Sequence, residues 1–309
     1  MPPSSHAASP AAIQSGVLII DKPPEVTSHD VVAAVRRHLR GSKVGHTGTL
    51  DPFATGVLPL VAGKATRLAQ HLTAGEKAYD AVVRLGRETD TYDVTGRVVS
   101  EAPPDRPLPS AGEIRDALAA FAGTWLQTPP AFSAKHSDGG RAYEQARRGI
   151  AVELPPVEVT VRGLELVAVE GGMVRVRLVT SPGFYVRSFA HQLGQRLGTG
   201  ACLESLRRTR SGGFTLDDAV PLERVLVDGP AAYLRPLATL LADWPGVEVT
   251  AEGADRIGHG REVGPAQCAV PAQALAAGGR VRLVGPDGAL LALAEVGPGP
   301  VLRPSVVLM

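Results

Sequence analysis

Residues 45–56 read GHTGTLDPFATG and place one carboxylate, Asp51, and one histidine, His46, among three glycines and three threonines. Glycine is favoured where the backbone needs a positive φ or where a ligand must approach it closely. Loops carried by rigid elements often hold binding and catalytic groups. The stretch therefore indicates a functional site, although Asp-Pro also initiates turns, and a turn residue is the competing interpretation of Asp51.

The segments around this loop predict alternating strands and helices. GVLIIDKP (16–23) and VLPLVAG (57–63) are typical of buried strands, and KATRLAQHL (64–72) of a short helix. Between them Ser28 is expected to cap a helix that ends before Gly41. The buried face of that helix is expected to carry Val31, Val32, Val35 and Leu39. In the strand within 76–86, alternation places Tyr79, Ala81, Val83 and Leu85 on one face.

Further elements follow downstream. Residues 110–113 (SAGE) have the spacing of a capping box and predict a helix with Ile114, Leu118 and Phe121 buried. Two strands, 157–169 and 173–180, flank a Gly-Gly pair and predict a hairpin. A helix is expected over 184–198, with Phe189, Leu193 and Leu197 on one stripe.

Composition divides the chain into three parts. Residues 1–15 are rich in Ala, Ser and Pro and are interpreted as a disordered tail, followed by a catalytic domain over 16–246. Within it, 123–150 has weak periodicity and is expected to be a long functional loop. From residue 247 to 309 there is no lysine, and short Val- and Leu-rich runs predict a small β-rich domain.

The overall composition is that of a soluble globular protein. Of the 309 residues, 44% are hydrophobic and 20% charged. Two cysteines, Cys202 and Cys268, are too few for a disulfide framework and suit a reducing cytoplasm. No apolar run approaches the ~18 residues of a membrane span. We therefore expect a cytoplasmic protein that does not bind membranes.

Positive charge is concentrated although the net charge is only +1. Residues 31–50 and 171–203 contain arginine and lysine but no acid, and three arginines lie within 207–210. Such a distribution is typical of a localised polyanion-binding groove. Solvated helix faces, balanced by acids elsewhere in the fold, are the alternative explanation.

Two further residues favour a catalytic role for Asp51. Arg187 is expected at a strand-to-helix junction, where a guanidinium beside a buried carboxylate would keep it ionised and oriented. Tyr79 offers an aromatic ring that could stack on a planar substrate.

Six ordered blocks resemble the motifs of the bacterial tRNA pseudouridine-55 synthases, the TruB family. They are GVLIIDKPPEVTSHDVV (16–32), KVGHTGTLDPFATGVLPL (43–60), KAYDAVVRLGRETDTYDVTG (77–96), QTPPAFSAKHSDGGRAYEQARRG (127–149), SPGFYVRSFAHQLG (181–194) and LRRTRSGGFTLDDA (206–219). The resemblance implies an α+β pseudouridine-synthase fold, with a mixed, largely antiparallel sheet and a catalytic cleft. The C-terminal segment resembles, more loosely, the small barrel-like PUA domain.

The resemblance also implies the reaction and the roles of single residues. A uridine in the TΨC loop of tRNA is flipped out and isomerised to pseudouridine, with Asp51 as catalytic carboxylate and no metal or organic cofactor. Substrate contacts are implied for His46, Tyr79, Asp90, Tyr185, Arg187 and Lys22. A structural turn role for His46, a core role for Tyr185 and a surface role for Lys22 are the alternatives.

The segment 123–150 resembles the family's RNA-gripping thumb loop, in which Lys135, Arg141, Arg147 and Arg148 would contact phosphates. Two departures stand out. Glu25 occupies the place of a usual glycine, and SAKH (133–136) shifts the usual basic residue by one position. We expect a monomer that acts on the tRNA TΨC stem-loop. The competing functions are a catalytically idle RNA-binding or tRNA-folding protein and, more remotely, a phosphotransferase that uses the loop as an anion nest.

Overall fold

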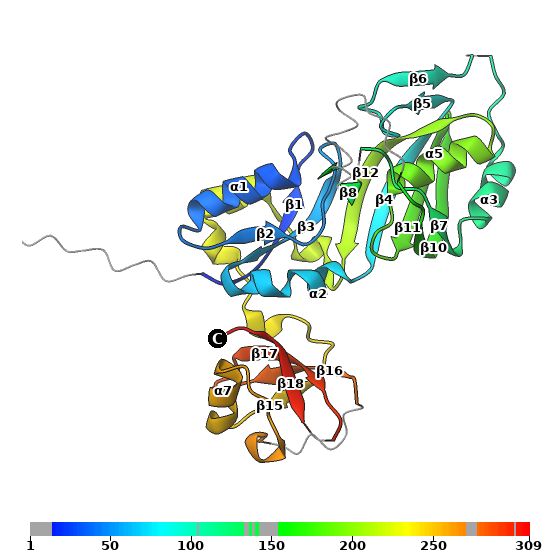
Figure 1. The fold of residues 1–309 in the computed structure, drawn as a ribbon. Helices are drawn as coiled ribbons and strands as arrows, with labels where there is room; N and C mark the ends of the chain where they lie inside the picture. Colours follow the sequence, from blue (N-terminus) through cyan, green and yellow to red (C-terminus); the bar gives the residue numbers. More distant parts are fainter. Residues whose placement is uncertain are drawn as a thin grey trace, which may run out of the picture.

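The computed structural model describes residues 14–103, 105–132, 154–269, 277–299 and 301–309, together with the backbone of 136–137 and 140–141. It has the expected α+β architecture, with one large mixed sheet and a separate smaller sheet (Figure 1). The large sheet has the order β14 (Val220–Pro221), β1 (Gly16–Lys22), β3 (Thr55–Ala62), β12 (Ala201–Ser211), β4 (Lys77–Leu85), β11 (Met173–Thr180), β10 (Val157–Glu170), β7 (Gly123–Gln127); β2 (Val44–His46) pairs with β3 and β13 (Phe214–Thr215) with β12.

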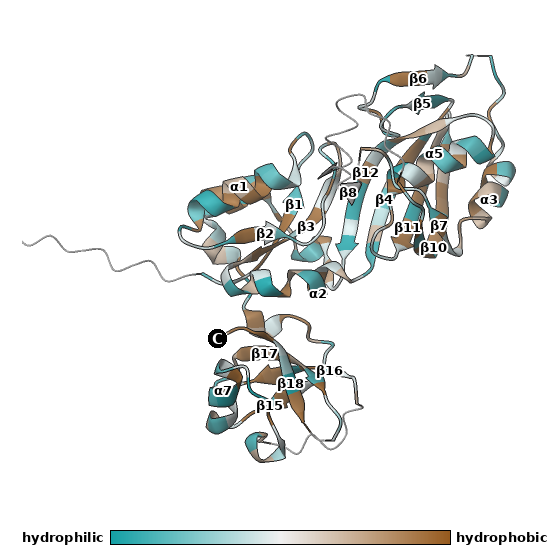
Figure 2. Cartoon of the chain, viewed as in Figure 1, coloured by the Kyte–Doolittle hydropathy of each residue, from teal (hydrophilic) through white to brown (hydrophobic). Residues whose placement is uncertain are grey.

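Strand β12 joins the two halves of this sheet. It pairs antiparallel with β4 along most of its length, but parallel with β3 at only two positions, Arg207 with Thr55 and Arg208 with Gly56. The remaining pairs are antiparallel except β1 with β14. Figure 2 shows a hydrophilic stretch on β12 in the middle of the sheet. The short parallel contact is therefore where the two half-sheets meet.

Helices and short strands cover this framework. They are α1 (Ser28–His38), the 3₁₀ turn η1 (Gly63–Leu68), α2 (Ala69–Thr73), α3 (Ala111–Ala119), α5 (Val186–Arg196) and α6 (Leu222–Asp228), with the pairs β5 (Arg87–Thr89) and β6 (Val98–Glu101), and β8 (His136–Ser137) and β9 (Gly140–Arg141). The strongly periodic predictions are confirmed. Tyr79, Ala81, Val83 and Leu85 are buried on β4, Ser110 and Glu113 form a capping box, and β10 and β11 form the hairpin.

Three expectations differ from the structure. Thr27, not Ser28, caps α1 through Asp30, because the Ser28 hydroxyl is buried and exchanges hydrogen bonds with the backbone of Leu50. The excursion expected from residue 123 begins with β7, which pairs with β10. Gln14 and Ser15, assigned to the tail, bond Ser42 and Lys64.

Glu25, which stands in the place of a usual glycine, has a positive φ. Its φ is +64°, and its N–H donates to the carbonyl of Pro52 at 2.9 Å. A side chain with a Cβ is strained in this left-handed region. The turn that follows β1 is therefore tied to the Asp51 loop at some cost in backbone energy.

The C-terminal part forms its own four-stranded sheet, in the order β15 (Gly246–Glu248), β16 (Arg280–Val284), β17 (Leu290–Val296), β18 (Leu302–Val307), with α7 (Ala251–Gly258) packed on it. A second apolar cluster joins it to the large sheet: Leu290, Leu293 and Leu308 pack with residues of β1, β3, η1 and α2. Arg67 in η1 also donates to the carbonyl of Val307 at 2.6 Å. The small sheet is thus attached by a shared apolar contact.

Candidate active site

A cavity of about 340 Å³ lies over the junction of the two half-sheets. Its walls come from the Asp51 loop, from β4 and β12, and from the turn into α5. The lining residues include Gly48, Asp51, Lys77, Tyr79, Phe132, Tyr185, Arg187, Leu206 and Arg208. Four of the residues predicted from sequence are therefore gathered around one space.

Asp51 and Arg187 form a two-pronged ion pair at this cavity. Arg187 Nε lies 2.9 Å from Asp51 Oδ2, and Nη2 donates to Oδ1 at 3.0 Å. The arginine side chain is only 7% exposed and also donates to the carbonyls of Thr91 and Phe132. The Asp51 side chain is 31% exposed and faces the cavity. A buried guanidinium thus fixes a carboxylate that a ligand can reach.

Burial raises the pKa of Asp51, the neighbouring Arg187 charge lowers it, and Asp93 raises it again. Because desolvation dominates, the carboxylate holds its proton more tightly than a solvated aspartate does. Its ionised form is poorly hydrated and sterically restrained. Such a group can attack a carbon or accept a proton over a short distance.

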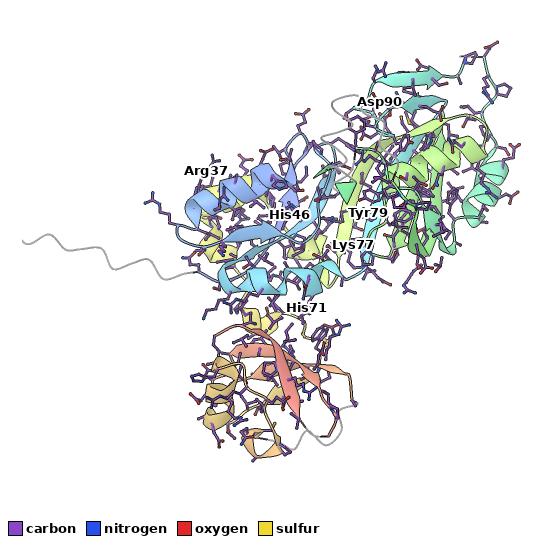
Figure 3. The ribbon with its side chains drawn as sticks, in the orientation of Figure 1. Arg37, His46, His71, Lys77, Tyr79 and Asp90 are labelled. Carbon is purple, nitrogen blue, oxygen red and sulfur yellow. The ribbon has the colours of Figure 1, made fainter. Side chains whose placement is uncertain are left out.

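Asp93, which the sequence did not single out, lies closer to this pair than Asp90. Asp93 Oδ2 is 3.8 Å from Arg187 Nη1, and its Oδ1 accepts from Thr91 and Thr95. Asp90 instead accepts from the backbone N–H of Arg97, and Figure 3 shows it apart from Tyr79. Spacing alone cannot separate the two aspartates, because a turn at Tyr92, with φ +64°, decides which of them points inward.

Tyr79 forms the floor of the cavity beside Arg208. Its side chain is buried, and burial raises the pKa of the phenol while the hydrogen bond and charge of Arg208 lower it. Arg208 is 2% exposed and donates to the carbonyls of Val57, Thr49 and Gly48. A guanidinium inside the sheet therefore holds the glycine-rich loop, a role that the sequence did not predict.

This corrects the polyanion groove expected at residues 207–210. Arg207 pairs with both carboxylate oxygens of Asp21, at 3.0 and 2.8 Å, and Arg210 lies 3.5 Å from Glu76. With Arg208 buried, none of the three is a free surface cation. These arginines stabilise the sheet and the loop.

Lys22 and Tyr185 support the site from either side. Lys22 is fully buried and donates to the carbonyls of Pro23 and Pro52 at 2.8 and 3.1 Å, so the alternative of a surface role does not apply. Burial lowers the pKa of its ammonium group to about 8. The backbone of Tyr185 exchanges two hydrogen bonds with the side chain of Gln127. Tyr185 also lines the cavity.

His46 lies beside a neighbouring cavity. Its ring packs edge-to-face against that of His29, with 5.4 Å between the ring centroids. The backbone N–H of Gly48 donates to Nδ1 of His46 at 3.3 Å. Burial, then the charges of His29 and Arg208, lower its pKa. Of the predicted phosphate contacts, Lys135, Arg147 and Arg148 lie outside the described residues, and Arg141 is described by its backbone alone, in β9.

The chain matches solved structures along nearly its whole length. The solved structure "Structure of H/ACA RNP bound to a substrate RNA containing 2'-deoxyuridine" matches with a TM-score of 0.70 and 26% identity, over 95% of this chain and 85% of that chain. The structure "Crystal Structure of a Cbf5-Nop10-Gar1 Complex" matches with a TM-score of 0.71 and 27% identity, over 95% of this chain and 85% of that chain. Such similarity defines the class of pseudouridine synthases.

The sequence comparisons narrow this class to one family. Residues 36–186 match "TruB family pseudouridylate synthase (N terminal domain)" and 187–238 match "tRNA pseudouridylate synthase B C-terminal domain". The "tRNA pseudouridine synthase B" of Solibacter usitatus (strain Ellin6076) is 46% identical over 95% of this chain and 99% of its own. The protein of the same name from Aromatoleum aromaticum (strain DSM 19018 / LMG 30748 / EbN1) is 43% identical, over 94% of this chain and 92% of its own length. The chain belongs to the TruB family of pseudouridine synthases.

Within the part of the chain that the structure describes, no helix is long and apolar enough to cross a membrane.

Proposed function

We propose that the protein isomerises a uridine in the TΨC loop of tRNA to pseudouridine, with Asp51 as the catalytic carboxylate. The observation that carries the proposal is the Asp51–Arg187 pair, which faces a cavity floored by Tyr79. The names of the curated relatives and the family match support the substrate and the reaction.

The geometry suits an isomerisation on an extruded base. A flipped uridine costs a few kcal/mol in lost stacking, which contacts elsewhere on the RNA must supply. Asp51 initiates cleavage of the N–C glycosidic bond, the uracil turns in place, and its carbon 5 bonds to the sugar. Carbon 5 then gives up its proton, and the ring nitrogen that left the sugar gains one. Product and substrate have the same atoms, so no oxidant or reductant is needed. Tyr79 holds the detached base, and Arg187 keeps Asp51 ionised and oriented.

Other residues support this reaction around the cavity. Lys22 and Arg208 hold the backbone of the Asp51 loop. We assign His46 to the RNA loop at the mouth of the site, and Lys135, Arg141, Arg147 and Arg148 to phosphate contacts. Residues 247–309 act as a PUA-like RNA-binding domain attached to a catalytic domain over 16–246, and the protein works as a cytoplasmic monomer.

The central test is the variant Asp51→Asn. Incubated with unmodified tRNA, it should form no pseudouridine, while its tRNA affinity stays within about twofold of the wild type, because Asn fills the same space without a nucleophilic charge. Asp90→Asn is the matched control and should remain active. Pseudouridine mapped at nucleotide resolution is the measurement. Activity in the Asp51 variant would refute the catalytic role, and an inactive wild type would favour an RNA-binding or RNA-folding protein.

A further inference from the structure

One basic surface is not used by the site described above. It consists of Arg36 and Arg37 at the end of α1, Arg40 and Lys43 in the following loop, and Lys64 in η1, and is called here the α1 basic face. All five side chains are exposed. Since residues 31–50 contain no acid, the sequence provides no local counter-charge.

The α1 basic face differs from the other basic segments. Arg187 pairs with Asp51, Arg207 with Asp21, and Arg177 with Asp80 and Glu165. In the described ranges, none of the five cations of the α1 basic face takes part in an ion pair with a carboxylate. In the described ranges, the α1 basic face therefore groups five exposed cations without ion-pair partners at one end of α1 and in the segments beside it.

The helix dipole does not account for this much charge. Cations near the C-terminus of a helix are favourable, but that end carries only about half an elementary negative charge. Arg36 and Arg37 alone exceed it, and Arg40, Lys43 and Lys64 lie outside the helix. The excess repels itself unless a polyanion binds there.

The α1 basic face is connected to the active site by structure. Helix α1 begins beside the Asp51 loop, where Ser28 bonds Leu50. Arg36 follows Ser28 by eight residues, about 12 Å along the helix axis. A cavity of about 520 Å³ is lined by Arg36 and Lys43 and also by His46, two residues before Gly48 of the active-site cavity. In the view of Figure 3, His46 lies between Arg37 and Tyr79.

We infer that the α1 basic face binds the phosphate backbone of the paired stem of the substrate RNA, outside the loop that carries the flipped nucleotide. Arg36 lies about 12 Å along α1 from Ser28, which bonds the Asp51 loop, so this face is set back from the active-site cavity. Unpaired bases are recognised by stacking on aromatic rings, whereas the five side chains of this face are all cations. The inference rests on the proposed function, and it adds a second RNA contact on the α1 side.

The test combines a triple variant with two RNA hairpins. Arg36→Ala, Arg40→Ala and Lys43→Ala are introduced together, and binding is measured by filter retention over a range of salt concentrations. One hairpin carries the TΨC loop on a full stem, and the other on a stem cut to about three base pairs. The matched control is Arg115→Ala with Arg196→Ala, two exposed arginines of α3 and α5.

For the full stem, the triple variant should bind at least about tenfold more weakly, and the slope of log affinity against log salt should fall by about one for each lost phosphate contact. For the short stem, variant and wild type should bind alike. Turnover at saturating RNA should be unchanged. An unaltered salt slope, or equal losses with both hairpins, overturns the inference. These outcomes do not depend on catalysis, so an inactive wild type would refute only the proposed function.

Discussion

At the scale of single residues, the charge of Asp51 opposes the stability of the fold. Burial raises the pKa of Asp51 above its usual value of 3.8, despite the attraction of Arg187. The folded state therefore binds the proton more tightly than the unfolded chain. The stability contribution of Asp51 is complete below the unfolded pKa and is lost as the pH rises through the folded pKa. Ionisation of Asp51 therefore lowers the stability of the folded state.

Arg187→Gln tests the electrostatic part of this arrangement. Without the guanidinium, the pKa of Asp51 should rise further, so the acidic limb of the kcat/KM profile should move to higher pH. Turnover at pH 7 should also fall, by about 100-fold, because the carboxylate loses its orientation. Pseudouridine formation is measured across pH in the wild type, in this variant and in the exposed control Arg177→Gln. An unshifted limb would show that Arg187 does not tune Asp51.

Glu25→Gly tests the strained turn after β1. Because Glu25 has a φ of +64°, replacing it with glycine should raise the free energy of unfolding by about 1 kcal/mol. The same change at Glu223, an exposed position in the first turn of α6, should lower it by about 1 kcal/mol. Urea midpoints measure both. A destabilised Glu25 variant would mean that the side chain contributes more than its backbone costs.

At the scale of elements, β12 organises the site through Arg208. The backbone of Arg208 lies opposite Tyr79 on β4 and opposite Gly56 on β3, while its side chain holds Gly48, Thr49 and Val57. A Cβ at Gly56 would lie 2.2 Å from the carbonyl oxygen of Arg208. The two half-sheets can therefore meet only over a glycine.

Gly56→Ala should be severely destabilising, by about 3 kcal/mol or more, because the clash is with backbone and φ is +100°. Gly41→Ala is the control, since Gly41 also has a positive φ, of +80°, but no heavy atom of the described residues, chain neighbours aside, lies within 4 Å of the position that a Cβ would take there. It should cost about 1 kcal/mol. Denaturant unfolding compares the two, and equal losses would show that the close approach is unimportant.

Elements with strong local patterns could be predicted, and those that depend on distant partners could not. The alternation of β4 and the capping box at Ser110 are local properties, and both are present in the structure. Strand β7 lacks alternation because most of its residues are exposed, and it is defined by pairing with β10. Likewise Arg208 resembles a surface arginine in sequence, since the carbonyls that it binds lie about 150 residues earlier.

At the scale of the whole molecule, the two sheets share an apolar contact. Leu293 of β17 is fully buried in a cluster that includes Val17, Leu68 and Leu72 of the large sheet. Burying a leucine side chain contributes roughly 1.5–3 kcal/mol. We therefore expect the small sheet to stabilise the catalytic domain, in addition to any contact with RNA.

Leu293→Ala should lower the free energy of unfolding by about 3 kcal/mol, because it removes buried methyl groups and leaves a cavity. The loss should extend to the catalytic domain, so amide hydrogen exchange in β1 and β3 should become faster. Leu126→Ala, at a position 67% exposed on β7, should change stability by no more than about 0.5 kcal/mol. Unchanged exchange in β1 and β3 would mean that the two sheets unfold independently.

The continuity of β12 also limits how a nucleotide can enter. Asp51 lies on the β3 side of the strand and Arg187 on the other, and both sides are hydrogen-bonded to β12. Walls that share one strand cannot part by rotating like two separate bodies. The substrate must therefore undergo most of the rearrangement. RNAs whose target nucleotide is already unstacked should be modified fastest.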